Sequence, residues 1–95
     1  MKRIVWNQEK ANVLSNDKSR GNISFEDCVI AIEDGRVLAD VPNPVKQYSH
    51  QRMFVIDINA YAYVVPYVET KDEIFLKTVF PSRKLTAIYI TGMKP

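Results

Sequence analysis

Several residue types that carry catalysis or covalent structure are scarce in this 95-residue sequence. The one cysteine, Cys28, cannot form an internal disulfide, and the one histidine, His50, has no second histidine to join. With only scattered carboxylates besides, no cluster has a metal-binding spacing, so we expect no metal site. Three glycines leave no glycine-rich phosphate loop, and neither G-x-S-x-G nor a Cys, His and Asn set is present. The sequence therefore predicts no cofactor and gives little support to a hydrolase with a side-chain nucleophile.

Long hydrophobic runs are also absent. No window approaches the roughly 20 apolar residues that span a bilayer, and residues 1–6 lack the apolar stretch of a signal peptide. Cys28 lies inside an apolar helical pattern, which indicates a small core residue and gives no reason to expect an oxidising compartment. We expect a soluble cytoplasmic protein without membrane contact, whose residues 1–95 form a single domain.

Acidic residues are missing from the C-terminal end. The segment from Ile74 to Pro95 contains Lys77, Arg83, Lys84 and Lys94 but neither Asp nor Glu. Residues 26–40 carry five acids against the single cation Arg36, so the net charge of +2 hides a separation of sign. This pattern predicts an anionic partner at the C-terminal end.

The first half of the chain predicts two helices. A short strand over residues 3–6 is followed by Asn7, which can cap a helix running to about Lys18. A basic linker, residues 18–22, leads to Ser24 and Asp27, which are spaced as a capping box. Gly35 ends this second helix, because glycine readily takes the left-handed conformation that follows a helix.

The second half predicts strands over residues 36–41, 52–57, 61–68 and 73–80. Short polar joints favour antiparallel hairpins, and Pro66 predicts a bulge or local gap because proline cannot donate to a ladder. A last helix begins after Ser82, carries Leu85, Ile88 and Tyr89 at helical spacing, and stops near Gly92. The predicted fold is α+β: two N-terminal helices, an antiparallel sheet of about four strands and a short C-terminal helix.

The start of the last helix is the main candidate site. Arg83 and Lys84 would occupy its first turn, where the helix dipole disfavours cations by roughly 0.3 to 1 kcal/mol each. Free amides, these cations, the Ser82 hydroxyl and nearby Lys77 would together suit a phosphate group. The alternative is that both cations are solvated or pair with acids such as Glu73 or Asp57.

Other candidates each have a structural alternative. His50 has the one side chain whose ordinary pKa lies near neutrality, but its polar neighbours are also typical of an exposed loop. Tyr61, Tyr63 and Tyr67 share one face of a predicted strand and could stack RNA bases, although such a stripe more often forms one wall of a core.

The order of these motifs resembles one protein family. The matching segments are Trp6-Asn-Gln-Glu-Lys10 with Asn12, Ile23-Ser-Phe-Glu-Asp27, Ile32-Glu-Asp34, Arg52 at a strand start, and Ser82-Arg-Lys84 before Tyr89. Over nearly the whole chain they resemble the BrnT-type toxins of bacterial type II toxin–antitoxin systems, which share the fold of RelE-like ribonucleases. The resemblance implies mRNA cleavage without a metal, growth arrest, and an antitoxin with a ribbon-helix-helix DNA-binding domain. Contact with DNA would occur only through that antitoxin.

If the resemblance holds, roles can be assigned. Arg83 and Arg52 would bind the scissile phosphate, and Lys77 or Lys84 would stabilise charge or transfer a proton. His50 or Tyr89 would be the remaining acid–base group. The hydroxyl of Ser82 and the cations Lys18 and Arg20 of the basic linker would contact RNA.

The sequence departs from the family in three places. Arg20-Gly-Asn22 stands where the family often has Lys-His-Gly, Gln51 stands where it has an acid, and the basic C-terminal extension is shorter. A candidate acid–base group is therefore missing. This leaves two alternatives to a ribonuclease: an inert RNA-binding protein, or a corepressor that only holds its antitoxin.

Overall fold

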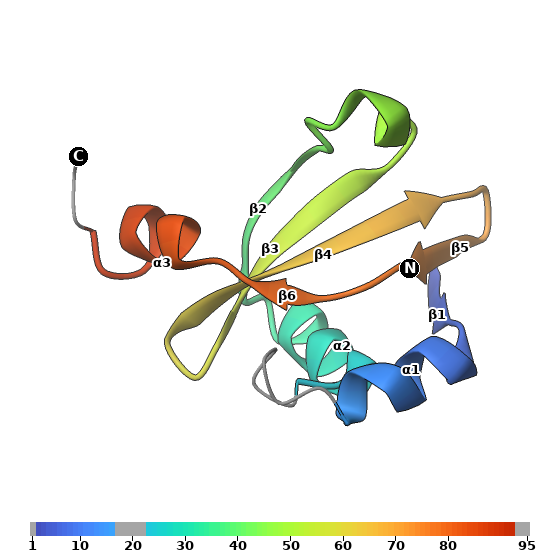
Figure 1. The fold of residues 1–95 in the computed structure, drawn as a ribbon, viewed down its shortest axis with the longest axis horizontal. Helices are drawn as coiled ribbons and strands as arrows, with labels where there is room; N and C mark the ends of the chain where they lie inside the picture. Colours follow the sequence, from blue (N-terminus) through green and yellow to red (C-terminus); the bar gives the residue numbers. More distant parts are fainter. Residues whose placement is uncertain (1, 17–22, 93–95) are drawn as a thin grey trace.

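The computed structural model describes residues 2–16 and 23–92 and has the predicted α+β class (Figure 1). Its helices are α1 (Gln8–Ser15), α2 (Phe25–Glu33) and α3 (Arg83–Tyr89), with a 3₁₀ turn at Lys46–Tyr48. Its strands are β1 (Arg3–Trp6), β2 (Val37–Pro42), β3 (Arg52–Ile58), β4 (Tyr61–Glu69), β5 (Glu73–Leu76) and β6 (Phe80–Pro81). In these residues no helix has the length and apolar character needed to cross a membrane.

The predicted caps of the first two helices are confirmed. The Asn7 side chain accepts a hydrogen bond from Lys10 N at 3.0 Å, and Ser24 and Asp27 form both bonds of a capping box. Gly35 follows α2 with a φ of +77°, the left-handed conformation expected there. Helix α1 ends at Ser15, earlier than predicted, and Lys18 lies outside the described residues.

The sheet is larger and more mixed than predicted. Six strands take part; five follow the order β1-β5-β4-β3-β2, and β6 also pairs with β4. The prediction of about four antiparallel strands was wrong because β1 joins the sheet parallel to β5, with Arg3 opposite Glu73. These two residues also form an ion pair. Pairing between segments so far apart in the chain involves no short joint that a sequence could reveal.

The predicted strand over residues 73–80 is also wrong, because it is broken into β5 and β6. Strand β5 pairs with residues 67–69 of β4, and β6 pairs with residues 63 and 64. Between them Lys77 N donates to Pro66 O at 2.8 Å, and the proline nitrogen has no hydrogen to return the bond. The gap predicted at Pro66 is therefore confirmed, and it divides the neighbouring strand.

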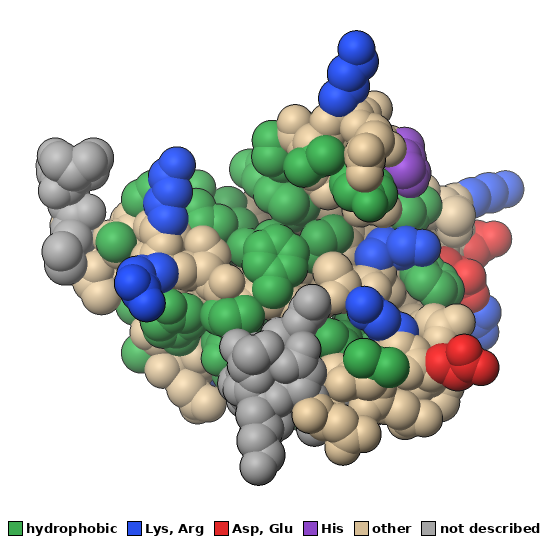
Figure 2. Space-filling view, viewed as in Figure 1, with side chains coloured by type: hydrophobic (Ala, Val, Ile, Leu, Met, Phe, Trp, Pro, Cys, Tyr) green, Lys and Arg blue, Asp and Glu red, His purple; other side chains and the backbone are tan. Residues whose placement is uncertain are grey.

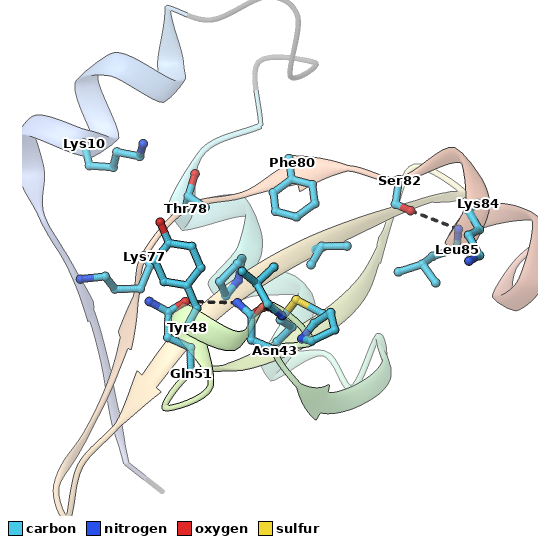
Figure 3. Close-up of a pocket in the computed structure, with 15 residues that line it drawn as sticks. Lys10, Asn43, Tyr48, Gln51, Lys77, Thr78, Phe80, Ser82, Lys84 and Leu85 are labelled. Carbon is cyan, nitrogen blue, oxygen red and sulfur yellow. Dashed lines mark hydrogen bonds between the residues drawn. The ribbon is translucent and has the colours of Figure 1, made fainter.

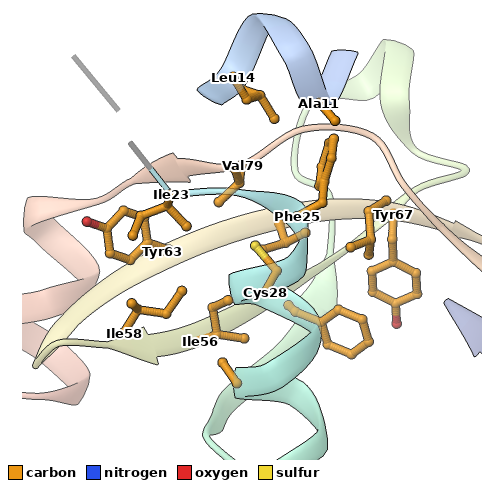
Figure 4. Close-up of a cluster of buried hydrophobic side chains, with 14 residues drawn as sticks. Ala11, Leu14, Ile23, Phe25, Cys28, Ile56, Ile58, Tyr63, Tyr67 and Val79 are labelled. Carbon is orange, nitrogen blue, oxygen red and sulfur yellow. The ribbon is translucent and has the colours of Figure 1, made fainter. Parts of the chain in front are cut away.

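Helices α1 and α2 cover one face of the sheet and seal the core there (Figures 1 and 4). Phe54 and Ile56 of β3 and Tyr63, Val65 and Tyr67 of β4 point to this face. Tyr67 is 2% exposed and Tyr63 is 9% exposed, so the tyrosine stripe is a wall of the core. Cys28 is also fully buried, as predicted, and burial raises the pKa of its thiol to about 12.

Helix α3 is attached to the beginning of β4, at Ala62. The Thr86 hydroxyl donates to Ser82 O at 2.7 Å and accepts from Ala62 N at 2.8 Å. The predicted apolar stripe of this helix does not enter the core, since Ile88 is 47% exposed and Tyr89 is 43% exposed. Thr86, a polar residue that is buried, provides the attachment instead.

Candidate functional site

A pocket of about 700 Å³ lies on the face of the sheet opposite α1 and α2 (Figure 3). Side chains alternate along a strand, so Met53, Val64 and Pro66 point away from the helices and form its apolar floor. One wall is the loop between β2 and β3, and the other is the segment from β5 through β6 to the start of α3. Together these elements form the open-face pocket.

The loop wall is held by its own hydrogen bonds. Asn43 N donates to Gln51 O at 3.0 Å, which closes the loop, and Gln51 N donates to Tyr48 O at 2.8 Å. The Tyr48 side chain lines the pocket from this loop and is 43% exposed. Phe80 of β6 also lines it, at 37% exposed. Two aromatic rings are therefore placed in the pocket without being buried by the protein.

The charged side chains that line the pocket are all cations. They are Lys10 of α1, Lys77 after β5 and Lys84 of α3. Within the part of the chain that the structure describes, none of the three forms an ion pair. The Lys77 ammonium lies 5.1 Å from the centre of the Phe75 ring, a cation–π contact. Figure 2 shows hydrophobic side chains gathered on this face with cations around them and acids only near one edge.

The predicted phosphate site at the start of α3 is only partly assembled. Ser82 and Lys84 line the pocket with Lys77, as the prediction required, but Arg83 is exposed and does not line it. The Ser82 hydroxyl accepts a hydrogen bond from Leu85 N at 3.1 Å and thus caps the helix. Arg83 and Lys84 are both exposed, which fits the alternative that these cations are solvated, and neither forms an ion pair with Glu73 or Asp57.

Arg52, which was predicted to bind the scissile phosphate together with Arg83, does not line the pocket. Its side chain shares the helix-covered side with Phe54, since residues of a strand alternate between faces. Its Nε donates to Asp40 Oδ1 at 3.1 Å and its Nη2 to Asp40 O at 2.9 Å. The Tyr67 hydroxyl donates to the same carboxylate at 2.8 Å. The guanidinium is therefore tied to the end of the sheet.

This cluster also changes the acid–base properties of its members. The hydrogen bond to Asp40 raises the pKa of Arg52, which keeps the guanidinium charged. Burial, followed by the nearby Asp40 carboxylate, raises the pKa of Tyr67 to about 12. Neither group is suited to proton transfer near neutral pH.

The remaining predicted site residues lie outside the pocket or outside the described residues. His50 is exposed in the loop and does not line the pocket, and Tyr89 is exposed at the end of α3. Lys18 and Arg20 belong to the segment that the structure does not describe. No cluster of three or more His, Cys, Asp or Glu suited to a metal ion is found in residues 2–16 and 23–92.

Sequence reasoning did not assign a role to Lys10, Tyr48, Gln51 or Phe80. Gln51 is only 7% exposed although it lines the pocket, and no local pattern distinguishes such a glutamine from a surface residue. Lys10 belongs to the segment that resembles the opening BrnT-type motif, but its position depends on how α1 packs against the rest of the fold. The positions of Gln51 and Lys10 in the pocket both depend on packing between segments that are distant in the sequence.

Comparisons with protein-family models, curated proteins and solved structures found no match for this chain.

Proposed function

We propose that the open-face pocket binds single-stranded RNA, and that the chain is the toxin of a type II toxin–antitoxin system. It would be a metal-independent mRNA endoribonuclease, with a RelE-like variant of the α+β fold. One observation carries the proposal: three lysines that form no ion pair with another described residue line a single pocket together with two exposed aromatic rings and no carboxylate. The order of BrnT-like motifs along the chain supports it.

The distribution of charge favours a polyanion over a small anion. Lys10 and Lys77 lie toward one end of the pocket and Lys84 toward the other (Figure 3). A strand with successive phosphates can satisfy both ends at once, whereas a single phosphate reaches only one. The apolar floor between them suits the bases of such a strand.

The aromatic rings favour a single strand over a duplex. Tyr48 and Phe80 offer faces on which unpaired bases can stack, a contact worth about 1 to 3 kcal/mol per base. In a duplex the bases already stack on one another and their faces are not available. Lysines that follow the backbone and aromatics that hold the bases are the usual combination in single-strand binding.

Cleavage would use the RNA's own 2′-hydroxyl as nucleophile. As that oxygen attacks the neighbouring phosphorus, the bond to the 5′-oxygen breaks, and negative charge accumulates on the phosphoryl oxygens. Lys77 and Lys84 are placed to stabilise this charge. Proton transfer would fall to Tyr48 or to one of the lysines, because His50 and Tyr89 do not line the pocket.

The resemblance also gives the partner and the compartment. We propose a cognate antitoxin with a ribbon-helix-helix DNA-binding domain, which neutralises the toxin and brings the complex to DNA. The toxin itself would act on mRNA in the bacterial cytoplasm.

A second function, RNA binding without cleavage, is favoured by one specific observation. Arg52, which the resemblance assigns to the scissile phosphate, is held by Asp40 and Tyr67, and Gln51 stands where the family has an acid. Without an arginine and an acid available at these two positions, the chain would bind RNA without cleaving it, or would act as a corepressor that only holds its antitoxin.

Induction in bacteria and binding in vitro test the two together. We expect the wild type to arrest growth and cleave mRNA, and the double variant Lys77→Ala/Lys84→Ala to lose both effects at equal soluble level. Lys71→Ala, in the exposed β4–β5 turn, is the matched control, and we expect it to remain toxic. Arg52→Ala should also remain toxic if its folded level is maintained.

The affinity of purified protein for a fluorescent RNA octamer separates the outcomes. Contacts to three phosphates predict a slope of about −2 for log affinity against log salt, and Lys77→Ala should reduce it by about 0.7. RNA that is retained but left intact would favour the inert alternative. Equal affinity of the double variant and the wild type would reject the pocket as the RNA site.

A further inference from the structure

The amide of Gln51 has an orientation that its neighbours determine. Val45 N donates to Asn43 Oδ1 at 3.0 Å, and a backbone N–H can only donate, so the Asn43 oxygen is fixed on that side. Asn43 Nδ2 then donates to Gln51 Oε1 across 3.4 Å, the bond drawn in Figure 3. The carbonyl oxygen of Gln51 therefore faces Asn43, and its Nε2 points away from it.

Within residues 2–16 and 23–92 this nitrogen is a hydrogen-bond donor without a partner. Among the described residues nothing accepts from Gln51 Nε2, although the residue is only 7% exposed. No fully buried side-chain nitrogen or oxygen in the same residues lacks a partner, so solvent reaches the Nε2 atom, and Gln51 is one of the residues that line the pocket. An accessible donor that Asn43 orients, on a largely buried residue beside an apolar floor, is suited to an acceptor on a ligand.

The acceptor belongs to a base more readily than to a phosphate. Gln51 is neutral, and the cations that suit phosphates, Lys10, Lys77 and Lys84, line other parts of the same pocket. The backbone Gln51 N is also bonded to the backbone Tyr48 O at 2.8 Å, so the loop keeps the two residues close together, and both line the pocket. A ring to stack on and an amide to read an edge are the two elements of base recognition in single strands.

We propose that Gln51 reads one base of the RNA bound in the open-face pocket, by donating from Nε2 to a carbonyl oxygen on the base edge while the base stacks on Tyr48. The proposal rests on the RNA-binding function proposed above. It predicts that the pocket prefers bases with a carbonyl at that edge, uracil and guanine, over cytosine and adenine. Cytosine and adenine carry an amino group there, which would set donor against donor.

Two matched pairs of RNA octamers test the preference, with identical flanks and one central test base. Uracil and cytosine differ by a carbonyl in place of an amino group, and hypoxanthine and adenine differ in the same way. We expect the wild type to bind the carbonyl member of each pair about two- to tenfold more tightly, the effect of one hydrogen bond. Gln51→Leu should remove the preference, and Lys77→Ala should weaken both members of a pair equally.

Gln51→Glu gives the sharpest result. Its carboxylate accepts instead of donating, so the preference should reverse toward cytosine and adenine, and this outcome does not depend on whether Gln51→Leu folds. A wild type that binds RNA with no preference, or a preference that survives in Gln51→Leu or Gln51→Glu, overturns the role of Gln51 and leaves RNA binding intact. A wild type that binds no octamer overturns both proposals.

Discussion

The two faces of the β3–β4 hairpin differ in whether their polar side chains have partners within the protein. On the side covered by α1 and α2, Phe54 and Tyr67 stack with ring centres 4.1 Å apart, and the Tyr67 hydroxyl is bonded to Asp40. On the open side, the pocket lysines have no ion pairs among the described residues, and Gln51 Nε2 has no acceptor. Both faces arise from the same strands by alternation.

Within this one sheet, the side chains that stabilise the fold and the side chains that are available to a ligand therefore lie on opposite faces. Polar groups that already have partners, such as Tyr67, stabilise the fold and gain nothing from a ligand. Charged and polar groups that line a pocket without partners contribute little to folding and are available for binding. Substitutions on the two faces should therefore have different consequences.

The largest expected effect on the free energy of unfolding comes from replacing a buried aromatic residue with alanine, compared with the same change at an aromatic residue of the pocket. Phe25 is fully buried, and its ring centre lies 5.8 Å from that of Trp6, on which it stacks. Phe25→Ala should lower the free energy of unfolding of the protein by about 3 to 5 kcal/mol. Phe80→Ala should cost much less, because that side chain is 37% exposed, yet it should weaken RNA binding. Urea denaturation and octamer binding measure the two effects. Equal destabilisation by both changes would remove the distinction between the faces.

The attachment of α3 should show the next largest effect. Thr86→Val keeps the shape of the side chain but leaves Ala62 N without an acceptor in a buried site, which costs about 1 to 3 kcal/mol. Thr86→Ser keeps the hydroxyl and is the matched control, with a smaller expected loss. Urea midpoints of the two variants provide the measurement, and a valine variant as stable as the serine variant would contradict the role of this bond.

High pH should destabilise the helix-covered side. Burial raises the pKa values of Cys28 and Tyr67 to about 12, above the ordinary values of 9.0 and 10.0, so the folded state holds their protons more tightly than the unfolded state. Below pH 9 both groups are protonated in both states and stability does not depend on them. As pH rises toward 12, from about 9 for Cys28 and from about 10 for Tyr67, each group favours unfolding by up to about 1.4 kcal/mol per pH unit.

Urea titrations between pH 8 and pH 11 check this dependence. Cys28→Ala and Tyr67→Phe should each flatten the alkaline loss, Cys28→Ala from about pH 9 and Tyr67→Phe from about pH 10. An unchanged slope in both variants would show that other groups govern the alkaline transition.

The smallest effect is expected at the turn that joins the two strands. Ala60 has a φ of +63°, a left-handed conformation that disfavours residues with a Cβ. Ala60→Gly should raise the unfolding free energy by about 0.5 to 1 kcal/mol, since relief of strain exceeds the added entropy of the unfolded chain. RNA affinity should not change, because Ala60 does not line the pocket. A lower urea midpoint for the glycine variant would contradict the expectation.

The parts of the fold that depend on neighbouring residues could be predicted from the sequence. The caps at Asn7 and Ser24, the glycine after α2, the tyrosine wall and the gap at Pro66 each follow from the residue itself or its near neighbours. The parallel pairing of β1 with β5 and the break between β5 and β6 could not, because they depend on contacts between distant segments.

The site was predicted only in part, for the same reason. Lys77, Ser82 and Lys84 come from one continuous segment and were found together, as predicted. Arg52 was assigned to the site, but one step of strand alternation places Gln51 and Met53 in the pocket and turns Arg52 to the other side. Lys10 reaches the pocket from α1, and only the packing of the helix brings it there.

Protection of individual lysines by RNA tests the central claim most directly. The protein is acetylated briefly with and without a saturating RNA octamer, and the modification of each lysine is measured by mass spectrometry. The account predicts that RNA protects Lys10, Lys77 and Lys84 and leaves Lys46 and Lys71, which do not line the pocket, as reactive as before. Protection of Lys46 and Lys71 with no protection of the three pocket lysines would contradict it.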